Sequence, residues 1–114
     1  MRILVCIFLL AGCISTALAH AVLVEAVPPV RGSVAGPDVA FRLRFNSRVD
    51  ASRSMLELRS PEGKVIPLSV EHQLSPDSLR AKSAHMGRGR YTLKWQVLSS
   101  DGHITRGEIP FDVR

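Results

Sequence analysis

The chain has 114 residues, with 15 Lys and Arg against 10 Asp and Glu, a formal net charge of +5 and a hydrophobic fraction of 46%. This length predicts one domain with one small hydrophobic core. The basic residues are spread along the chain and few aromatic residues accompany them, which argues against a nucleic-acid partner. Solubility, an acidic partner protein or an anionic membrane surface would each account for the charge.

The first 19 residues are typical of a secretory signal peptide. A positively charged start is followed by the uncharged apolar run 3–10 and then by Ala17-Leu18-Ala19, the small residues at which signal peptidase cuts. The segment is too short to span a membrane. We therefore expect its removal on export, which leaves residues 20–114 as a single domain that begins at His20.

A second processing site overlaps this leader. Leu10-Ala11-Gly12-Cys13 resembles a bacterial lipoprotein box, whose cysteine becomes the lipidated first residue. That cut would leave His20 internal, with its amine converted to an amide. The conventional layout favours cleavage after Ala19, and lipidation at Cys13 is the alternative.

Both cysteines of the chain, Cys6 and Cys13, lie within this leader. The domain that follows residue 19 therefore has no thiol. This excludes disulfides, Cys-ligated zinc, iron–sulfur clusters and a cysteine nucleophile from the domain.

Beyond residue 20, apolar residues alternate with polar ones, which is typical of half-buried β-strands. Gly- and Pro-containing turns separate the strands, and no segment has helical periodicity. Pro67 and Pro110 lie inside strands and indicate edge or bulged positions. The pattern predicts an all-β, seven-stranded antiparallel Greek-key β-sandwich. The strands are expected at 22–27, 39–45, 54–59, 64–70, 78–82, 91–97 and 105–113.

The direction of these strands has a consequence for function. If successive strands reverse direction, the first strand starts at the same end of the sandwich as the loops that join strands two to three, four to five and six to seven. The last of these loops contains Asp101-Gly102-His103. We therefore expect His20 and this loop to share one end, which is about 10 Å across.

These residues form a candidate metal site. After cleavage, His20 places a free α-amine beside an imidazole, and Asp101 and His103 would add a carboxylate and a second imidazole. This nitrogen-rich, tetragonal ligand set suits Cu(II) better than Ca²⁺, Mg²⁺ or structural zinc. By itself the Asp-Gly-His triplet is typical of a turn, and Asp101 could bind the metal directly or orient His103.

The remaining candidate residues have simpler explanations. His72 and His85 lack comparable partners and are expected on the surface, whereas Trp95 falls on the inward side of its strand and belongs in the core. Met55 and Met86 are far apart in sequence, so the thioether cluster that Cu(I) prefers is not expected. No nucleophile arrangement or second acid–base pair is visible, so the sequence predicts no hydrolytic enzyme.

One stretch of the chain resembles a known family. The Tyr91-x-x-x-Trp95 strand leads into Ser99-x-Asp101-Gly102-His103 and is followed by Gly107-x-x-x-Phe111. Together with His20-Ala21 after the signal cut, this resembles the periplasmic copper-resistance protein C (CopC) domain family over essentially the whole mature chain.

The resemblance implies a cupredoxin-like or immunoglobulin-like sandwich that binds copper in the periplasm, often beside a membrane protein of the CopD type. It also implies that His20, Asp101 and His103 are the Cu(II) ligands. Many members carry a second His two residues after the first, where this chain has Val22. Some members have a Met-rich Cu(I) loop, and its absence here predicts a protein for Cu(II).

Three function classes follow. The favoured one is a monomeric, non-enzymatic Cu(II) carrier that buffers copper or passes it to a CopD-like inner-membrane transporter. The second is an oxidative enzyme, because an N-terminal His with another His also describes the copper brace of polysaccharide monooxygenases; the acidic ligand and the small size argue against it. The third is a metal-free interaction sandwich, which the lipoprotein cut would favour.

Overall fold

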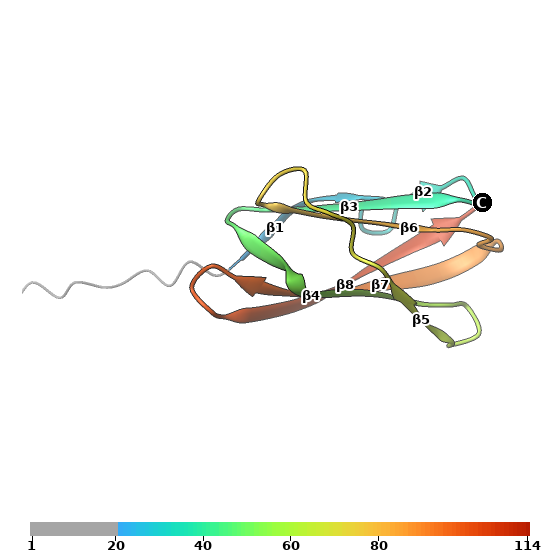
Figure 1. Ribbon diagram of the computed structural model, residues 1–114. Coiled ribbons are helices and arrows are strands. Elements are labelled where there is room, and N and C mark those ends of the chain that lie inside the picture. The colour runs from blue at the N-terminus through green and yellow to red at the C-terminus, as the bar shows by residue number, and fades with distance from the viewer. Residues whose placement is uncertain (1–20) are drawn as a thin grey trace, which may run out of the picture.

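The computed structural model describes residues 21–114, which form eight β-strands without a helix (Figure 1). In this part of the chain no helix long and apolar enough to cross a membrane is found. The expected signal peptide, both cysteines and His20 lie outside the described residues. The strands are β1 (Leu23–Val27), β2 (Ser33–Val34), β3 (Val39–Phe45), β4 (Val49–Arg59), β5 (Val65–Leu68), β6 (Ser78–Ser83), β7 (Gly89–Ser99) and β8 (Ile104–Val113).

The strands form two sheets that lie one above the other (Figure 1). One sheet has three strands in the order β1-β3-β6, and the other has five in the order β2-β8-β7-β4-β5. All neighbours are antiparallel except β2 and β8. The expected all-β sandwich is confirmed.

All seven strands expected from the sequence are present, and the eighth, β2, was missed. β2 has two residues, and it pairs in parallel with Asp112 and Val113 of β8. Two residues are too short to show an alternation, so only the pairing partner defines this strand. β4 also begins at Val49 rather than at residue 54. A bulge between Asp50 and Met55 interrupts its pairing with β7, so this part of the strand does not show the regular alternation that identifies a strand.

Both strand prolines occupy positions where a missing N–H is tolerated. Pro67 lies in β5, an edge strand of the five-stranded sheet. Pro110 lies in β8, which has β7 on one side and β2 on the other, but β2 pairs only with Asp112 and Val113, beyond Pro110. Its carbonyl accepts a hydrogen bond from the backbone N–H of Arg31 at 2.6 Å. The prediction of an edge strand is therefore confirmed for Pro67, whereas Pro110 lies in a strand that β2 flanks.

The core lies between the two sheets and is built by alternation. In β3 the four large apolar residues Val39, Phe41, Leu43 and Phe45 are buried, and each residue between them is exposed. Trp95 of β7 is 8% exposed and packs edge-on against Phe45 of β3, with ring centroids 5.3 Å apart. Its indole also covers Gly107 on β8, where an added Cβ would lie 2.3 Å from the ring. The core role expected for Trp95 is confirmed, and it requires glycine opposite.

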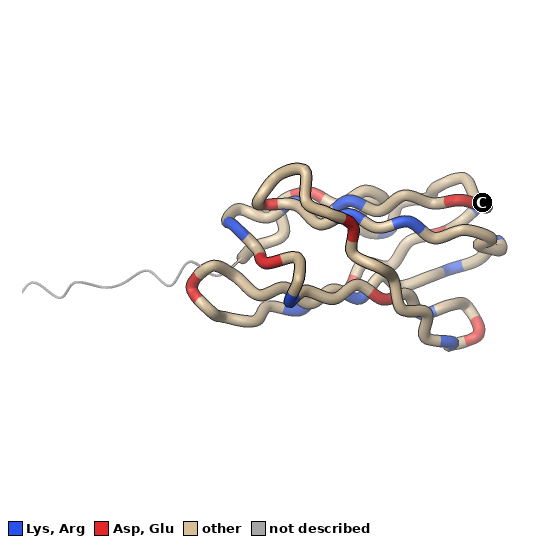
Figure 2. Tube along the Cα trace, viewed as in Figure 1, with Lys and Arg blue, Asp and Glu red and all other residues tan. Residues whose placement is uncertain are grey.

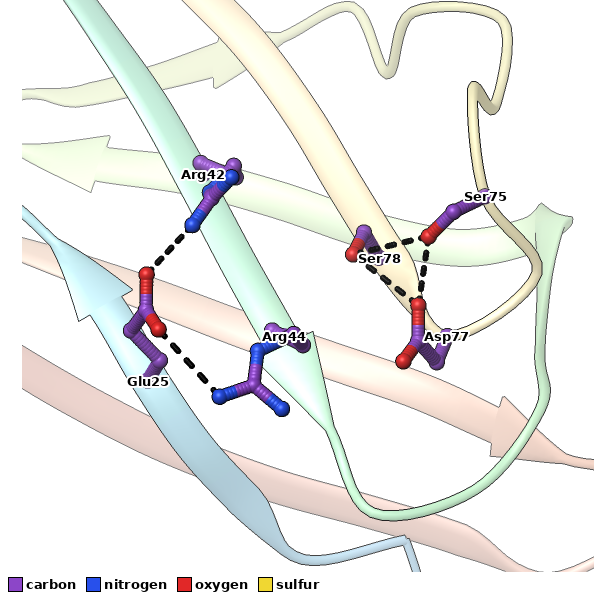
Figure 3. A network of polar contacts seen from close by, with 6 residues as sticks. All are labelled: Glu25, Arg42, Arg44, Ser75, Asp77 and Ser78. Carbon is purple, nitrogen blue, oxygen red and sulfur yellow. Dashed lines mark hydrogen bonds and ion pairs between the residues drawn. The ribbon is translucent and has the colours of Figure 1, made fainter.

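Charged residues are spread over both sheets and the loops (Figure 2). On the outer face of the three-stranded sheet, Glu25 of β1 pairs with both Arg42 and Arg44 of β3 (Figure 3). These hydrogen bonds from the two arginines lower the pKa of Glu25. These ion pairs are exposed, so each contributes little to stability. Arg42 and Arg44 are basic residues at the outward-facing positions of β3.

Candidate metal centre

The Asp101-Gly102-His103 loop is a tight turn between β7 and β8. The N–H of Ser99 donates to the carbonyl of His103 at 2.9 Å, and the N–H of Gly102 donates to the carbonyl of Ser99 at 3.0 Å. Gly102 has φ +84°, the left-handed region in which other residues are strained. The turn therefore depends on glycine, and it holds the residues on either side of Gly102 close together.

Within this turn the carboxylate of Asp101 has a defined orientation. Its Oδ1 accepts hydrogen bonds from the hydroxyl of Ser99 and, at 3.1 Å, from the backbone N–H of His103. Its Oδ2 lies 3.1 Å from Nδ1 of His103. The Ser99 hydroxyl is the main cause of a lowered pKa for Asp101, with smaller contributions from His103. Asp101 is therefore held as the ionised carboxylate, the form that binds metals.

The pair fits a metal ion geometrically. Two donors that each lie about 2.0 Å from one metal at a right angle are roughly 2.8 Å apart, near the 3.1 Å between Oδ2 and Nδ1, which contact each other directly in the metal-free chain. The side chains of His103 and Asp101 are 43% and 24% exposed, so an ion could reach them from solvent. Among residues 21–114, however, no group of three or more His, Cys, Asp or Glu could hold a metal. The two side chains are thus a pair of candidate ligands.

The start of the described chain lies at the same end as this turn. The β3–β4 loop connects the two: Asn46 exchanges hydrogen bonds with the backbone of Val22, at 2.8 and 2.9 Å, and the carbonyl of Arg48 accepts from the N–H of Ser100 at 3.3 Å. Ala21 is 1% exposed and belongs to the core. Figure 1 shows the start of β1 and the β7–β8 turn at the left end of the sandwich.

The third loop expected at this end is also there. The carbonyls of Pro76 and Asp77 accept hydrogen bonds from Val49 and Phe45, at 2.9 and 2.8 Å. The prediction from strand direction is therefore confirmed for all three loops. His20 lies outside the described residues, so its place at this end stays a prediction.

Comparison with known proteins decides the family. The model of the CopC domain matches residues 23–114, which is most of the chain. The chain belongs to the CopC family. Its members are copper-binding and copper-resistance proteins and not enzymes.

Individual CopC relatives cover nearly the same span. The crystal structure of CopC from Methylosinus trichosporium OB3b is 33% identical with a TM-score of 0.77, covering 82% of this chain and 93% of that one. PcoC, a methionine-rich copper resistance protein from Escherichia coli, is 25% identical with a TM-score of 0.68, covering 84% and 100%. Copper resistance protein C from Xanthomonas campestris pv. juglandis is 28% identical over 108 residues, 88% of this chain and 84% of that protein.

The other candidate residues of this CopC-family chain are not gathered with Asp101 and His103. His72 is exposed between β5 and β6, and His85 is exposed in the β6–β7 loop at the opposite end of the sandwich. Met55 is exposed on β4 opposite Gln96, whereas Met86 is buried and donates its N–H to Pro37. Met55 and Met86 therefore form no common thioether site.

Sequence reasoning missed Ser99 as a part of this centre. Among residues 21–114, Ser99 is the one polar residue that is buried, with 3% of its surface exposed. Its hydroxyl donates a hydrogen bond to Asp101. A signal was available, because Ser99 continues the inward-facing alternation of Tyr91, Leu93, Trp95 and Val97. A hydroxyl at the end of a buried apolar row needs a hydrogen-bonding partner nearby.

Proposed function

We propose that this protein binds Cu(II) in the periplasm, buffers it and carries it to a CopD-like membrane transporter. His20, Asp101 and His103 are the proposed ligands. The observation that carries the proposal is the 3.1 Å separation of Asp101 Oδ2 and His103 Nδ1, at the end of the sandwich to which the backbone of Val22 is tied.

The chemistry of the donors favours Cu(II). The α-amine and imidazole of His20 would chelate the ion, and the carboxylate and second imidazole would complete a nitrogen- and oxygen-rich tetragonal set. A carboxylate is a hard ligand that favours Cu(II) over Cu(I), and the separation of Met55 from Met86 leaves no soft site. Copper is here the cargo, and the partial exposure of Asp101 and His103 would allow its transfer.

The cellular place of the proposed function rests on the leader and on the family. The sequence of residues 1–19 predicts export, and cleavage after Ala19 would create the amine that the site needs. The relatives from Escherichia coli and Xanthomonas campestris are copper resistance proteins. A periplasmic carrier that acts as a monomer is consistent with both.

Copper titration of the exported protein tests the proposal. After its N-terminal mass has been measured, the protein is expected to bind one Cu(II) per chain, with an electron-resonance spectrum typical of a tetragonal nitrogen and oxygen site. Affinity should fall from pH 7 towards pH 5, because the amine and imidazoles, with reference pKa values of about 7.7–8.0 and 6.5, must lose protons to bind. An intense blue-copper absorption band, or no binding, would contradict it.

A further inference from the structure

The inference concerns Ser99, which the proposed ligand set does not include. Ser99 is 3% exposed and is the last of the inward-facing residues of β7. A buried hydroxyl without a hydrogen bond is costly, so the acceptor that it finds has structural consequences.

Two acceptors lie within reach of this hydroxyl. They are Oδ1 of Asp101 and, at 3.0 Å, the carbonyl of His103. The hydroxyl has a single proton, and the carbonyl of His103 already accepts the N–H of Ser99 at 2.9 Å. A carboxylate is also the stronger acceptor because it is charged. The Ser99 hydroxyl therefore donates its hydrogen bond to Asp101.

This bond makes the two oxygens of Asp101 unequal. Oδ1 receives both the Ser99 hydroxyl and the backbone N–H of His103, and its two lone pairs are then used. Oδ2 faces Nδ1 of His103 at 3.1 Å. Rotation of the carboxylate would break both bonds to Oδ1, so the orientation is preset before any metal arrives.

We propose that Ser99 is a positioning residue that commits Asp101 to bind Cu(II) through Oδ2 alone, beside Nδ1 of His103. This rests on the proposed function. A carboxylate held in this way cannot offer both oxygens to a metal, and it needs no reordering when Cu(II) binds. Partners that orient a metal ligand typically change metal affinity by about 10- to 100-fold when removed.

The chain offers a matched control for testing Ser99. Ser60 occupies the same place in the turn between β4 and β5, where its hydroxyl accepts the N–H of Lys64 at 3.0 Å and touches no carboxylate. Ser60→Ala therefore removes a hydroxyl bond of an equivalent turn without affecting Asp101. Ser99→Thr keeps the hydroxyl at the original position.

The test measures Cu(II) affinity and the electron-resonance spectrum of wild type, Ser99→Ala, Ser99→Thr and Ser60→Ala, after chemical unfolding has shown that each is folded. We expect Ser99→Ala to bind about tenfold more weakly with an altered spectrum. Ser99→Thr should stay within about threefold of wild type, and Ser60→Ala should be unchanged. In the metal-free proteins, NMR couplings should show one χ1 rotamer for Asp101 in wild type and an average in Ser99→Ala.

The outcomes separate this inference from the proposed function. If wild type binds one Cu(II) but Ser99→Ala matches it in affinity, spectrum and Asp101 rotamer, Ser99 is not a positioning residue. If Ser60→Ala loses as much affinity as Ser99→Ala, the effect is general destabilisation of the fold and the inference is wrong. If wild type binds no Cu(II), the proposed function itself fails and the inference with it.

Discussion

Two turns of this protein have the same backbone and different chemistry. The turn 60–64 joins β4 to β5, and the turn 99–103 joins β7 to β8 at the opposite end of the sandwich. Each begins with Ser and has Gly as its fourth residue, with φ +83° in one and +84° in the other. The backbone bonds agree within 0.1 Å: Ser60 to Lys64 2.8 Å and Gly63 to Ser60 2.9 Å, against Ser99 to His103 2.9 Å and Gly102 to Ser99 3.0 Å.

The side chains make the difference. In the first turn the third residue is Glu62, which is exposed and has no hydrogen bond or ion pair within residues 21–114, and the fifth is Lys64, which cannot bind a metal while charged. In the second, the shorter Asp101 folds back onto Ser99 and His103. The turn itself is thus a general scaffold. Asp and His at its third and fifth positions place a carboxylate oxygen and an imidazole nitrogen 3.1 Å apart.

Location is the second difference. Only the turn 99–103 lies at the end where the β3–β4 loop also holds Val22. The comparison therefore predicts that the turn is necessary but insufficient, and that the missing donors come from His20. Four changes to the protein test this prediction.

The largest effect is expected from the N-terminus. A protein that retains Ala19 before His20 has an amide in place of the α-amine and loses a chelate ring. We expect its Cu(II) affinity to fall by several kcal/mol, more than about a hundredfold. Competition with a chromophoric chelator would measure this. Its unfolding free energy should not change, because the bonds between Val22 and Asn46 remain. Matching affinities would remove His20 from the site and favour the lipoprotein cut.

Loss of a turn ligand should have the next largest effect. We expect His103→Ala to weaken Cu(II) binding by about a hundredfold, and Asp101→Ala by about tenfold or more, because each removes a proposed direct donor. Isothermal calorimetry would compare the variants.

The controls for these substitutions come from the other turn and from the remaining histidines. Glu62→Ala, Lys64→Ala, His72→Ala and His85→Ala should all be nearly neutral. Equal losses in any of them would show that the ligand assignment is wrong.

A graft tests whether the turn is sufficient. Glu62→Asp combined with Lys64→His, in a His103→Ala background, should reproduce the donor pair at the opposite end of the sandwich. We expect its Cu(II) affinity to stay at least about a hundredfold below that of wild type, because no amine chelate is available there. Recovery of wild-type affinity would mean that an Asp and a His on this turn are enough.

The smallest effect concerns the metal-free protein in acid. The pKa of Asp101 is lowered in the folded state, mainly by the Ser99 hydroxyl, so its stabilising contribution is present above the unfolded pKa of about 3.9 and is lost as pH falls through the lower folded pKa. The difference in unfolding free energy between wild type and Asp101→Asn should therefore shrink from pH 5 to pH 2. A difference that stays constant with pH would contradict the assigned hydrogen bonds.

Most of the fold could be predicted from the sequence, because the alternation of apolar and polar residues within a strand shows which of its faces is buried. The alternation of Val39 to Phe45 is local, and it identifies both the strand and its inward face. β2 and the start of β4 could not be found in this way, since a two-residue strand and a bulged segment have no period of two. Their pairing partners lie far away in the chain.

The site was partly predictable for the same reason. Asp101 and His103 are neighbours in sequence with a glycine between them, so their proximity is a local property of the turn. The contacts of Asn46 with Val22 and of Arg48 with Ser100 join segments more than twenty residues apart, and no local pattern indicates them.

Residue type and the spacing of a few positions are enough to show which residues alternate, where the chain turns, which loops share an end and which side chains can bind copper. The tertiary structure was needed to show that Ser99 is buried beside Asp101, and that the β3–β4 loop bonds to both Val22 and Ser100. Both depend on how two sheets pack and on which strands pair, and hydrogen bonds between distant segments settle these only when the whole chain has folded.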